Sequence, residues 1–366
     1  MNRLIGLAAF VLAAAAAAAT AAPAPVLLGA PPVYLEVKDW VLACDNTRVC
    51  FAKYDVADEA NAGGGYLSLA RDAGPDGGLT VTLEATEDGA VPDPKTLTLD
   101  GQPLSPNPAW KISPTDQTAD LSGAAALAFV HAIANGKTLA YSDGQTTTTV
   151  SLGGMTAALL AMDQDQGRLD GVTALAKPGS KPASAVPAAL PVPVVHATPA
   201  KTPLTGAAAF AAQVRNVQAG LLRQHDCEAD AVHDDTAAAL NDHDAIVLLG
   251  CVQGAYQASV MTFRAPRDAP QKAVRLILPL QPTLKASDIP ADARGEYVAE
   301  DGWDAKTATF VESAKGRGLA DCGQSTEWVF DGAQFQVDSF NRLDRCGGGP
   351  PGDWPTIYRT TISPAK

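Results

Sequence analysis

Six cysteines constrain this chain more than any other feature of its sequence. Fifteen pairings are possible in principle, but pairing each cysteine with its neighbour gives separations of 6, 24 and 24 residues. The repeated separation favours these local pairs, and closing a loop of about 25 residues stabilises a fold by roughly 3–4 kcal/mol in the chain-entropy model. The sequence therefore predicts three disulfides, which are Cys44–Cys50, Cys227–Cys251 and Cys322–Cys346.

The first 22 residues have the pattern of a secretory signal peptide. Arg3 supplies a positive start, residues 4–19 form an apolar run, and small residues follow as far as Ala22. The run is shorter than the roughly 20 residues that a membrane-spanning helix needs, and no later segment is long and apolar enough to span. We therefore expect cleavage near Ala22 and a periplasmic or secreted protein, a location where disulfides form.

The chain is acidic, with a formal net charge of −13 at pH 7. Proteins that bind nucleic acid need basic patches that neutralise phosphates, so a nucleic-acid partner is not expected. Acidity identifies no other partner, because it mainly reports solubility.

A proline-rich segment divides the chain. Residues 177–205 contain seven prolines in 29 positions, a composition that stiffens a chain toward polyproline II and buries little apolar surface. The length of 366 residues also exceeds the usual size of one domain. We therefore expect an N-terminal domain at 33–176, a linker at 177–205 and a C-terminal domain at 206–362.

The N-terminal part has strands first and helices later. Apolar and polar residues alternate over 33–37, which is the period of a strand, and 66–71 and 79–85 form a hairpin pattern around a Gly-rich spacer. The apolar segments 121–134 and 153–162 have helical patterns. This order predicts an α+β domain.

The C-terminal part begins with a helix. An apolar stripe through Phe210, Val214, Val217 and Leu221 predicts that helix at 205–224. Strand-like apolar segments follow it, at 245–252, 256–264 and 273–280. We expect this helix to be followed by a mainly antiparallel β-sheet.

A Trp-to-Phe spacing that occurs twice predicts stacked hairpins near the C-terminus. Phe310 follows Trp303 by seven residues, and Phe335 follows Trp328 by the same interval. Asp331-Gly332 lies inside the second copy and is a strong signal for a tight hairpin turn. Two copies are too few for a propeller or solenoid.

No metal or cofactor is expected, although possible metal ligands occur together. Zinc binds histidine and cysteine tetrahedrally, but the spacings match no zinc motif, and a disulfide between the two cysteines is the better interpretation. The segment 163–174 is similar to a calcium loop but lacks Gly at position 6 and Glu at position 12. The possible zinc ligands are His225, Cys227, His233, His243 and Cys251.

No catalytic residue is assigned either. The chain contains neither a GxSxG elbow nor an SxxK motif. A cell-envelope hydrolase is the rival hypothesis, with Asp301, Asp304 and Asp321 as its acidic groups. Such chemistry needs two carboxylates within roughly 5–10 Å of each other, which sequence alone does not establish.

A set of aromatic and arginine side chains near the C-terminus forms the candidate binding residues. These side-chain types dominate binding hot spots, although Trp328 and Trp354 equally suit the core of a small sheet. The candidates are Arg317, Trp328, Trp354, Tyr358 and Arg359.

Several separate motifs resemble those of a bacterial family catalogued as a domain of unknown function, number 1176. Two positions depart from the family pattern, with Ala320 in place of Gly and Gly347 in place of Arg. The resemblance implies an exported Gram-negative protein without an assigned activity, and it identifies no catalytic residues. The opening motif is also similar to that of the invasion-associated locus B type of envelope protein. The motifs are KDWVLACDNTRVC (38–50), 151–175, CVQGAYQ (251–257), RGLADCG (317–323), EWVFDGAQFQV (327–337) and RCGGGPPGDWPTIYR (345–359).

Together these observations favour an uncharacterised periplasmic protein that acts by binding or as an accessory of the envelope. Its partner would be another protein or a component of the envelope. Two alternatives are the hydrolase described above and a secreted inhibitor or adhesin-like protein that binds a partner.

Overall fold

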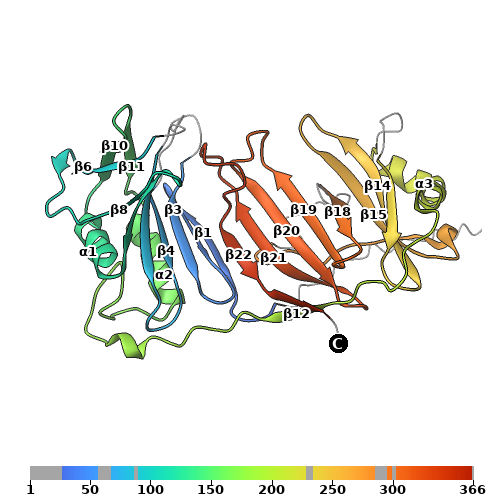
Figure 1. Cartoon of the computed structure of the whole chain (residues 1–366), viewed down its shortest axis with the longest axis horizontal. Helices are drawn as coiled ribbons and strands as arrows, with labels where there is room; N and C mark the ends of the chain where they lie inside the picture. The colour runs from blue at the N-terminus through green and yellow to red at the C-terminus, as the bar shows by residue number, and fades with distance from the viewer. Residues whose placement is uncertain are drawn as a thin grey trace, which may run out of the picture.

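The described residues form five β-sheets, and the three largest follow one another along the molecule in the computed structural model (Figure 1). Within the described residues the strands pair mostly antiparallel and there are three α-helices, so β-structure dominates the predicted α+β class. No helix in this part of the chain is long and apolar enough to cross a membrane. The predicted signal peptide at 1–22 lies outside the described residues. These are 27–56, 67–85, 90–227, 234–284, 295–298 and 302–364.

The N-terminal sheet has seven strands, and each neighbouring pair is antiparallel. The predicted hairpin at 66–71 and 79–85 is confirmed as β4 and β5. Along β5 every second residue is buried, because one face of the sheet covers a core. In spatial order the strands are β1 (Val33–Val37), β2 (Trp40–Cys44), β3 (Cys50–Tyr54), β4 (Leu67–Arg71), β5 (Leu79–Glu84), β9 (Thr118–Ser122) and β8 (Lys111–Ser113).

Two helices and a smaller sheet complete the N-terminal part. The helices α1 (Gly123–Ile133) and α2 (Met155–Asp165) confirm the predicted helices at 121–134 and 153–162. Phe129 and Met155 belong to the same buried cluster as Trp40 of β2, so the helices cover one face of the N-terminal sheet. The smaller sheet consists of β11 (Thr147–Ser151), β10 (Thr138–Ser142), β6 (Asp93–Leu99) and β7 (Gln102–Pro103).

The distal sheet lies at the far end of the molecule with the third helix (Figure 1). The helix α3 (Ala207–Gln224) confirms the prediction for 205–224 and buries Phe210 and Val214 against β14 and β15. The Cys227–Cys251 disulfide joins the chain just after α3 to β14. The strands are β13 (Thr236–Ala239), β14 (Asp244–Gln253), β15 (Ala258–Pro266) and β16 (Val274–Arg275), with β17 (Glu296–Tyr297) also paired to β15.

The central sheet contains both predicted tryptophan hairpins. The first hairpin is β18–β19, and the second is β20–β21, whose turn contains Asp331-Gly332. Trp328 is fully buried, and Trp303 packs edge-on against Phe335. In order, the strands are β18 (Gly302–Asp304), β19 (Thr309–Lys315), β20 (Gly323–Phe330), β21 (Phe335–Leu343) and β22 (Thr356–Arg359).

The prediction of a strand at 273–280 is wrong beyond Arg275. After β16 the chain leaves the distal sheet, and buried Leu278 joins the core of the central sheet. The Leu278 N–H donates to the Tyr297 hydroxyl, and the Pro279 carbonyl accepts from the Trp328 indole. The apolar run therefore fills the space between two sheets instead of extending one of them.

The proline-rich segment 177–205 runs along the molecule toward the C-terminus (Figure 1). It contains a short 3-10 helix (Ala183–Ala185) and the strand β12 (Val194–Ala197). This strand pairs in parallel with β23 (Thr361–Pro364), and Val195 and Ala197 are buried. The segment thus has ordered contacts along its length, while the division of the chain into two domains stays a prediction.

The N-terminal sheet packs directly against the central sheet through β2. All five residues of β2 are buried, because each of its faces meets a different part of the protein. Leu42 faces the core below the helices, whereas Val41 packs with Leu343 and Trp354. Ala43 joins the core of the central sheet.

The side chain of Asn46 closes this junction. It is fully buried, and its amide donates to the carbonyls of Leu28 (3.0 Å) and Arg359 (2.9 Å). Its oxygen accepts the Arg359 N–H at 3.0 Å. The amide group therefore replaces a neighbouring strand along the free edge of β22.

Replacing this asparagine will destabilise the fold. Asn46→Ala leaves partly buried backbone groups of Leu28 and Arg359 without these partners, and we expect a loss of roughly 2–4 kcal/mol in the free energy of unfolding. Urea denaturation of the oxidised protein measures this loss. The control is Asn135→Ala, because Asn135 is exposed, and we expect it to cost less than about 1 kcal/mol. Equal midpoints for the two variants would contradict the role assigned to Asn46.

Candidate binding site

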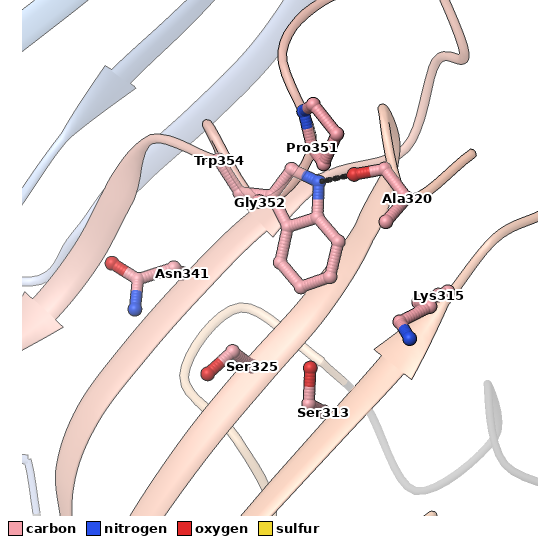
Figure 2. A pocket seen from close by; sticks show the side chains of 8 residues that line it. All are labelled: Ser313, Lys315, Ala320, Ser325, Asn341, Pro351, Gly352 and Trp354. Carbon is pink, nitrogen blue, oxygen red and sulfur yellow. Dashed lines mark hydrogen bonds between the residues drawn. The ribbon is translucent and has the colours of Figure 1, made fainter. Parts of the chain in front are cut away.

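A cavity of about 330 Å³ opens over one face of the central sheet (Figure 2). Side chains of the sheet line its floor, and the segment 350–354 forms a wall. The lining residues are Ser313, Lys315, Ala320, Ser325, Asn341, Pro351, Gly352 and Trp354.

The floor of the cavity is a row of polar side chains across three strands. Ser313 of β19 pairs with Ser325 of β20, which pairs in turn with Asn341 of β21. Residues directly opposite each other in an antiparallel sheet share a face, so these three side chains lie side by side (Figure 2). Lys315 lies two residues beyond Ser313 and therefore points to the same face.

The wall of the cavity is Trp354, which is held at its polar edge. Its indole N–H donates to the Ala320 carbonyl at 3.2 Å, and the same carbonyl accepts the Gly352 N–H at 2.8 Å. Figure 2 shows the six-membered part of the indole extending toward Ser325 and Ser313. Trp354 as a residue is 8% exposed, and it packs with Val41. Trp354 thus belongs to the junction on one side and to the cavity on the other.

Gly323 leaves room for this tryptophan. Its φ is +144°, and an added Cβ would lie 2.8 Å from Cζ2 and 2.9 Å from Cη2 of Trp354. The same Cβ would lie 2.3 Å from the Ala314 carbonyl oxygen. Any side chain at this position would therefore displace Trp354 or the backbone of β19.

Gln257 fixes the edge of the cavity from another sheet. It follows the turn between β14 and β15, and its amide donates to the Ser313 carbonyl at 2.5 Å. Its oxygen accepts the Lys315 N–H at 2.7 Å. The Tyr256 hydroxyl also contacts the Gly316 carbonyl at 3.4 Å. The CVQGAYQ motif thus closes the free edge of β19 where the strand supplies Ser313 and Lys315.

The five predicted binding residues have different surroundings. Trp354 lines the cavity, whereas Trp328 is fully buried and bonded to Pro279. The Tyr358 hydroxyl accepts the Leu28 N–H at 3.0 Å. The two arginines form ion pairs within the chain, Arg317 with Asp321 and Arg359 with Asp45. A role of these residues in binding stays a prediction.

Residues of the cavity floor were missed from sequence. Ser313, Ser325 and Asn341 are small polar residues without a motif, and they become neighbours only through the register of β19, β20 and β21. Alternation along β19 is the one signal that links Lys315 to Ser313.

All three predicted disulfides are present. Two groups in the described residues bring an acid close to a disulfide, Asp165 near Cys44–Cys50 and Asp321 near Cys322–Cys346. Metals bind cysteine as the free thiolate, so neither group suits a metal ion. The Cys227–Cys251 disulfide likewise removes both sulfurs from the zinc alternative, and His233 lies outside the described residues.

The acids of the hydrolase hypothesis do not converge. Asp304 is exposed and pairs with Thr309 at one end of β19, while Asp321 lies beside Cys322 at the other end. The length of β19 separates them by roughly 20 Å at about 3.3 Å per residue. Hydrogen bonds from Arg317 lower the pKa of Asp321, which also accepts the Gly348 N–H. Asp301 lies outside the described residues.

A second cavity, of about 640 Å³, lies in the N-terminal part beside Trp110. Pro92, Pro94 and Pro108 line it together with Ile112. It is separate from the cavity at Trp354, and none of the motifs quoted above contributes to it.

The sequence profile of a family described as Protein of unknown function (DUF1176) matches residues 34–361. The chain belongs to this family. It is 32% identical over 359 residues to the Uncharacterized protein YpfG of Escherichia coli (strain K12), covering 91% of this chain and 95% of that protein. A crystal structure of invasion associated protein B from Bartonella henselae matches 37% of this chain and 99% of that one, with 19% identity and a TM-score of 0.27. A similarity this low carries no argument about the fold.

Ala320 and Gly347, the two positions expected from sequence to depart from the family pattern, both lie close to the cavity wall. Ala320 has a φ of +57°, a left-handed conformation that glycine adopts more easily, and its carbonyl holds Trp354. An added Cβ at Gly347 would lie 2.1 Å from Oδ1 of Asp55, so the position as folded has no room for a side chain.

Gly323→Ala tests the packing of the cavity wall. The new methyl group collides with Trp354, and we expect a loss of roughly 2–4 kcal/mol in the free energy of unfolding and a changed near-UV tryptophan signal. The control is Gly220→Ala in α3, where an added Cβ meets nothing within 4 Å. Alanine favours a helix over glycine, so this control will be neutral or stabilise by up to about 1 kcal/mol. An unchanged tryptophan signal in Gly323→Ala would contradict the packing described here.

Proposed function

We propose that the protein is a non-catalytic binding protein of the cell envelope, and that the cavity at Trp354 is its binding site. The observation that carries this proposal is the combination of groups around one cavity. An ammonium group, two hydroxyls, an amide and an aromatic ring surround it, from Lys315, Ser313, Ser325, Asn341 and Trp354. Small-molecule sites typically combine a small number of convergent polar groups with an aromatic or apolar surface.

The chemistry of these groups defines a class of ligand. The Lys315 ammonium favours an anionic group, while the serine hydroxyls and the Asn341 amide both donate and accept hydrogen bonds. The apolar surface of the Trp354 indole suits the apolar face of a ring. A volume of about 330 Å³ is at the lower end for ligand sites, so one ring-sized unit fits. We infer an acidic, hydroxylated ligand such as a uronic acid unit of an envelope glycan.

The proposed location is the periplasm. Three disulfides are consistent with an extracytoplasmic protein, and the pattern of residues 1–22 supports export. We also propose that the chain comprises the two domains predicted from sequence, 33–176 and 206–362. Under this proposal the cavity belongs to the C-terminal domain, and the N-terminal domain supports its wall through Val41.

Titration with D-glucuronate and D-glucose tests the proposed site. Calorimetry should detect glucuronate and find glucose at least about tenfold weaker, because glucose lacks the carboxylate. Lys315→Gln should remove this preference. The matched control is Lys306→Gln, since Lys306 is exposed in the turn at the other end of β19, and it should bind both sugars like the unaltered protein. Absence of glucuronate binding, or an unchanged preference in Lys315→Gln, would overturn the proposal.

A further inference from the structure

A buried carboxyl group lies where the cavity wall meets the N-terminal sheet. Asp55 directly follows β3, is 1% exposed, and donates its N–H to the Asp39 carbonyl at 2.8 Å. Opposite it is the segment 345–354, which begins at Arg345 and ends at Trp354. An added Cβ at Gly347 would lie 2.1 Å from Oδ1 of Asp55, so the two chain segments touch at this carboxyl group.

Two ion pairs tie the segment 345–354 to the N-terminal sheet around Asp55. Arg345 donates to the carbonyls of Lys38 and Asp55 and pairs with Glu36 at 3.2 Å. Lys53 of β3 pairs with Asp353 at 3.4 Å, and Asp353 directly precedes Trp354. The Lys53 side chain is 3% exposed, whereas that of Asp353 is 50% exposed. The second pair therefore links the buried side of the junction to the outer part of the cavity wall.

The Asp55 carboxyl group is poorly compensated in its ionised form. Its Oδ2 atom has no hydrogen-bond partner among the described residues. Burial raises the pKa of Asp55 to about 7, the charges of Glu36 and Asp321 add to this rise, and Lys53 and Arg345 oppose it. Charged and titratable groups surround Asp55 on every element packed there. They are Glu36, Lys38 and Asp39 from β1 and the turn after it, Lys53 and Tyr54 from β3, Glu84 from β5, which interacts with both Lys53 and Asp353, Asp321 with Arg317, and Arg345 and Asp353 from the segment 345–354.

We propose that Asp55 is a proton-operated latch for the cavity at Trp354, an inference that rests on the proposed binding function. When Asp55 is neutral, Lys53 stays paired with Asp353 and the wall is docked. When Asp55 releases its proton to solvent, its carboxylate draws Lys53 away from Asp353 and the wall loosens. Lys53 is the cation positioned for this exchange, because residues two apart on a strand point to the same side.

The direction of the pH effect follows from the two states. An aspartate in an unfolded chain has a pKa of about 3.9, so between that value and about 7 the docked state holds a proton that an exposed carboxylate would release. The cavity wall is therefore held most firmly against the N-terminal sheet at low pH, and this contact weakens as the pH rises through neutrality. The glucuronate carboxylate does not titrate in this pH range, so a change in affinity over the range is caused by a titrating group of the protein.

The test follows two readouts from about pH 6 to about pH 8.5. One is the affinity for D-glucuronate, and the other is the NMR signal of the Trp354 indole N–H without ligand, assigned with Trp354→Phe. We expect affinity to fall by about tenfold and the indole signal to shift with one apparent pKa near neutrality. In Asp55→Asn both profiles should be flat, and the exposed control Asp304→Asn should keep the original profiles.

A second variant keeps the test decisive if Asp55→Asn does not fold. Lys53→Gln removes the pair with Asp353, so the indole N–H should exchange rapidly with solvent at every pH and its signal should no longer titrate. A Trp354 signal that titrates normally in either variant would overturn the latch. Absence of glucuronate binding at every pH, with a Trp354 signal that still titrates, would overturn the binding function and leave the latch in place.

Discussion

The structure depends on side-chain amides that act as substitutes for backbone. Asn46 exchanges two hydrogen bonds with the backbone of Arg359 at the edge of β22, and Gln257 exchanges two with β19. An open edge of a sheet presents unpaired N–H and C=O groups, which other chains can bind. Because the Cys44–Cys50 hairpin supplies one amide and the β14–β15 hairpin the other, the central sheet is held between the two flanking sheets.

Local features of this fold could be predicted from sequence. The helices, the tryptophan hairpins and the disulfides each depend on residues close together in the chain, and their patterns appear within one short window. The strand predicted at 273–280 is wrong beyond Arg275, because the apolar residues that follow pack against a different sheet, and the Leu278 N–H donates to the Tyr297 hydroxyl. An apolar run predicts that a segment is buried, but it does not predict which part of the protein the segment packs against.

The cavity could not be predicted, because its parts meet only in the folded chain. Ser313 faces Ser325 through strand register, and Trp354 reaches them because Gly323 has no side chain. The predicted binding residues show a related limit. Arginine and aromatic side chains suit partner surfaces, and the same chemistry suits contacts within one chain, as the Arg359–Asp45 ion pair shows. Composition alone does not separate these two uses.

The parallel pairing of β12 with β23 brings the last residues of the chain back to its middle. Those residues follow β22 directly, the strand that Asn46 joins to the start of the described chain. During synthesis the amino-terminal sheet emerges first, so Val41 and Ala43 remain in contact with water until the carboxyl-terminal strands arrive. A nascent chain therefore carries an uncovered apolar surface for almost the whole of its synthesis, and a premature stop codon near the end would make that exposure permanent.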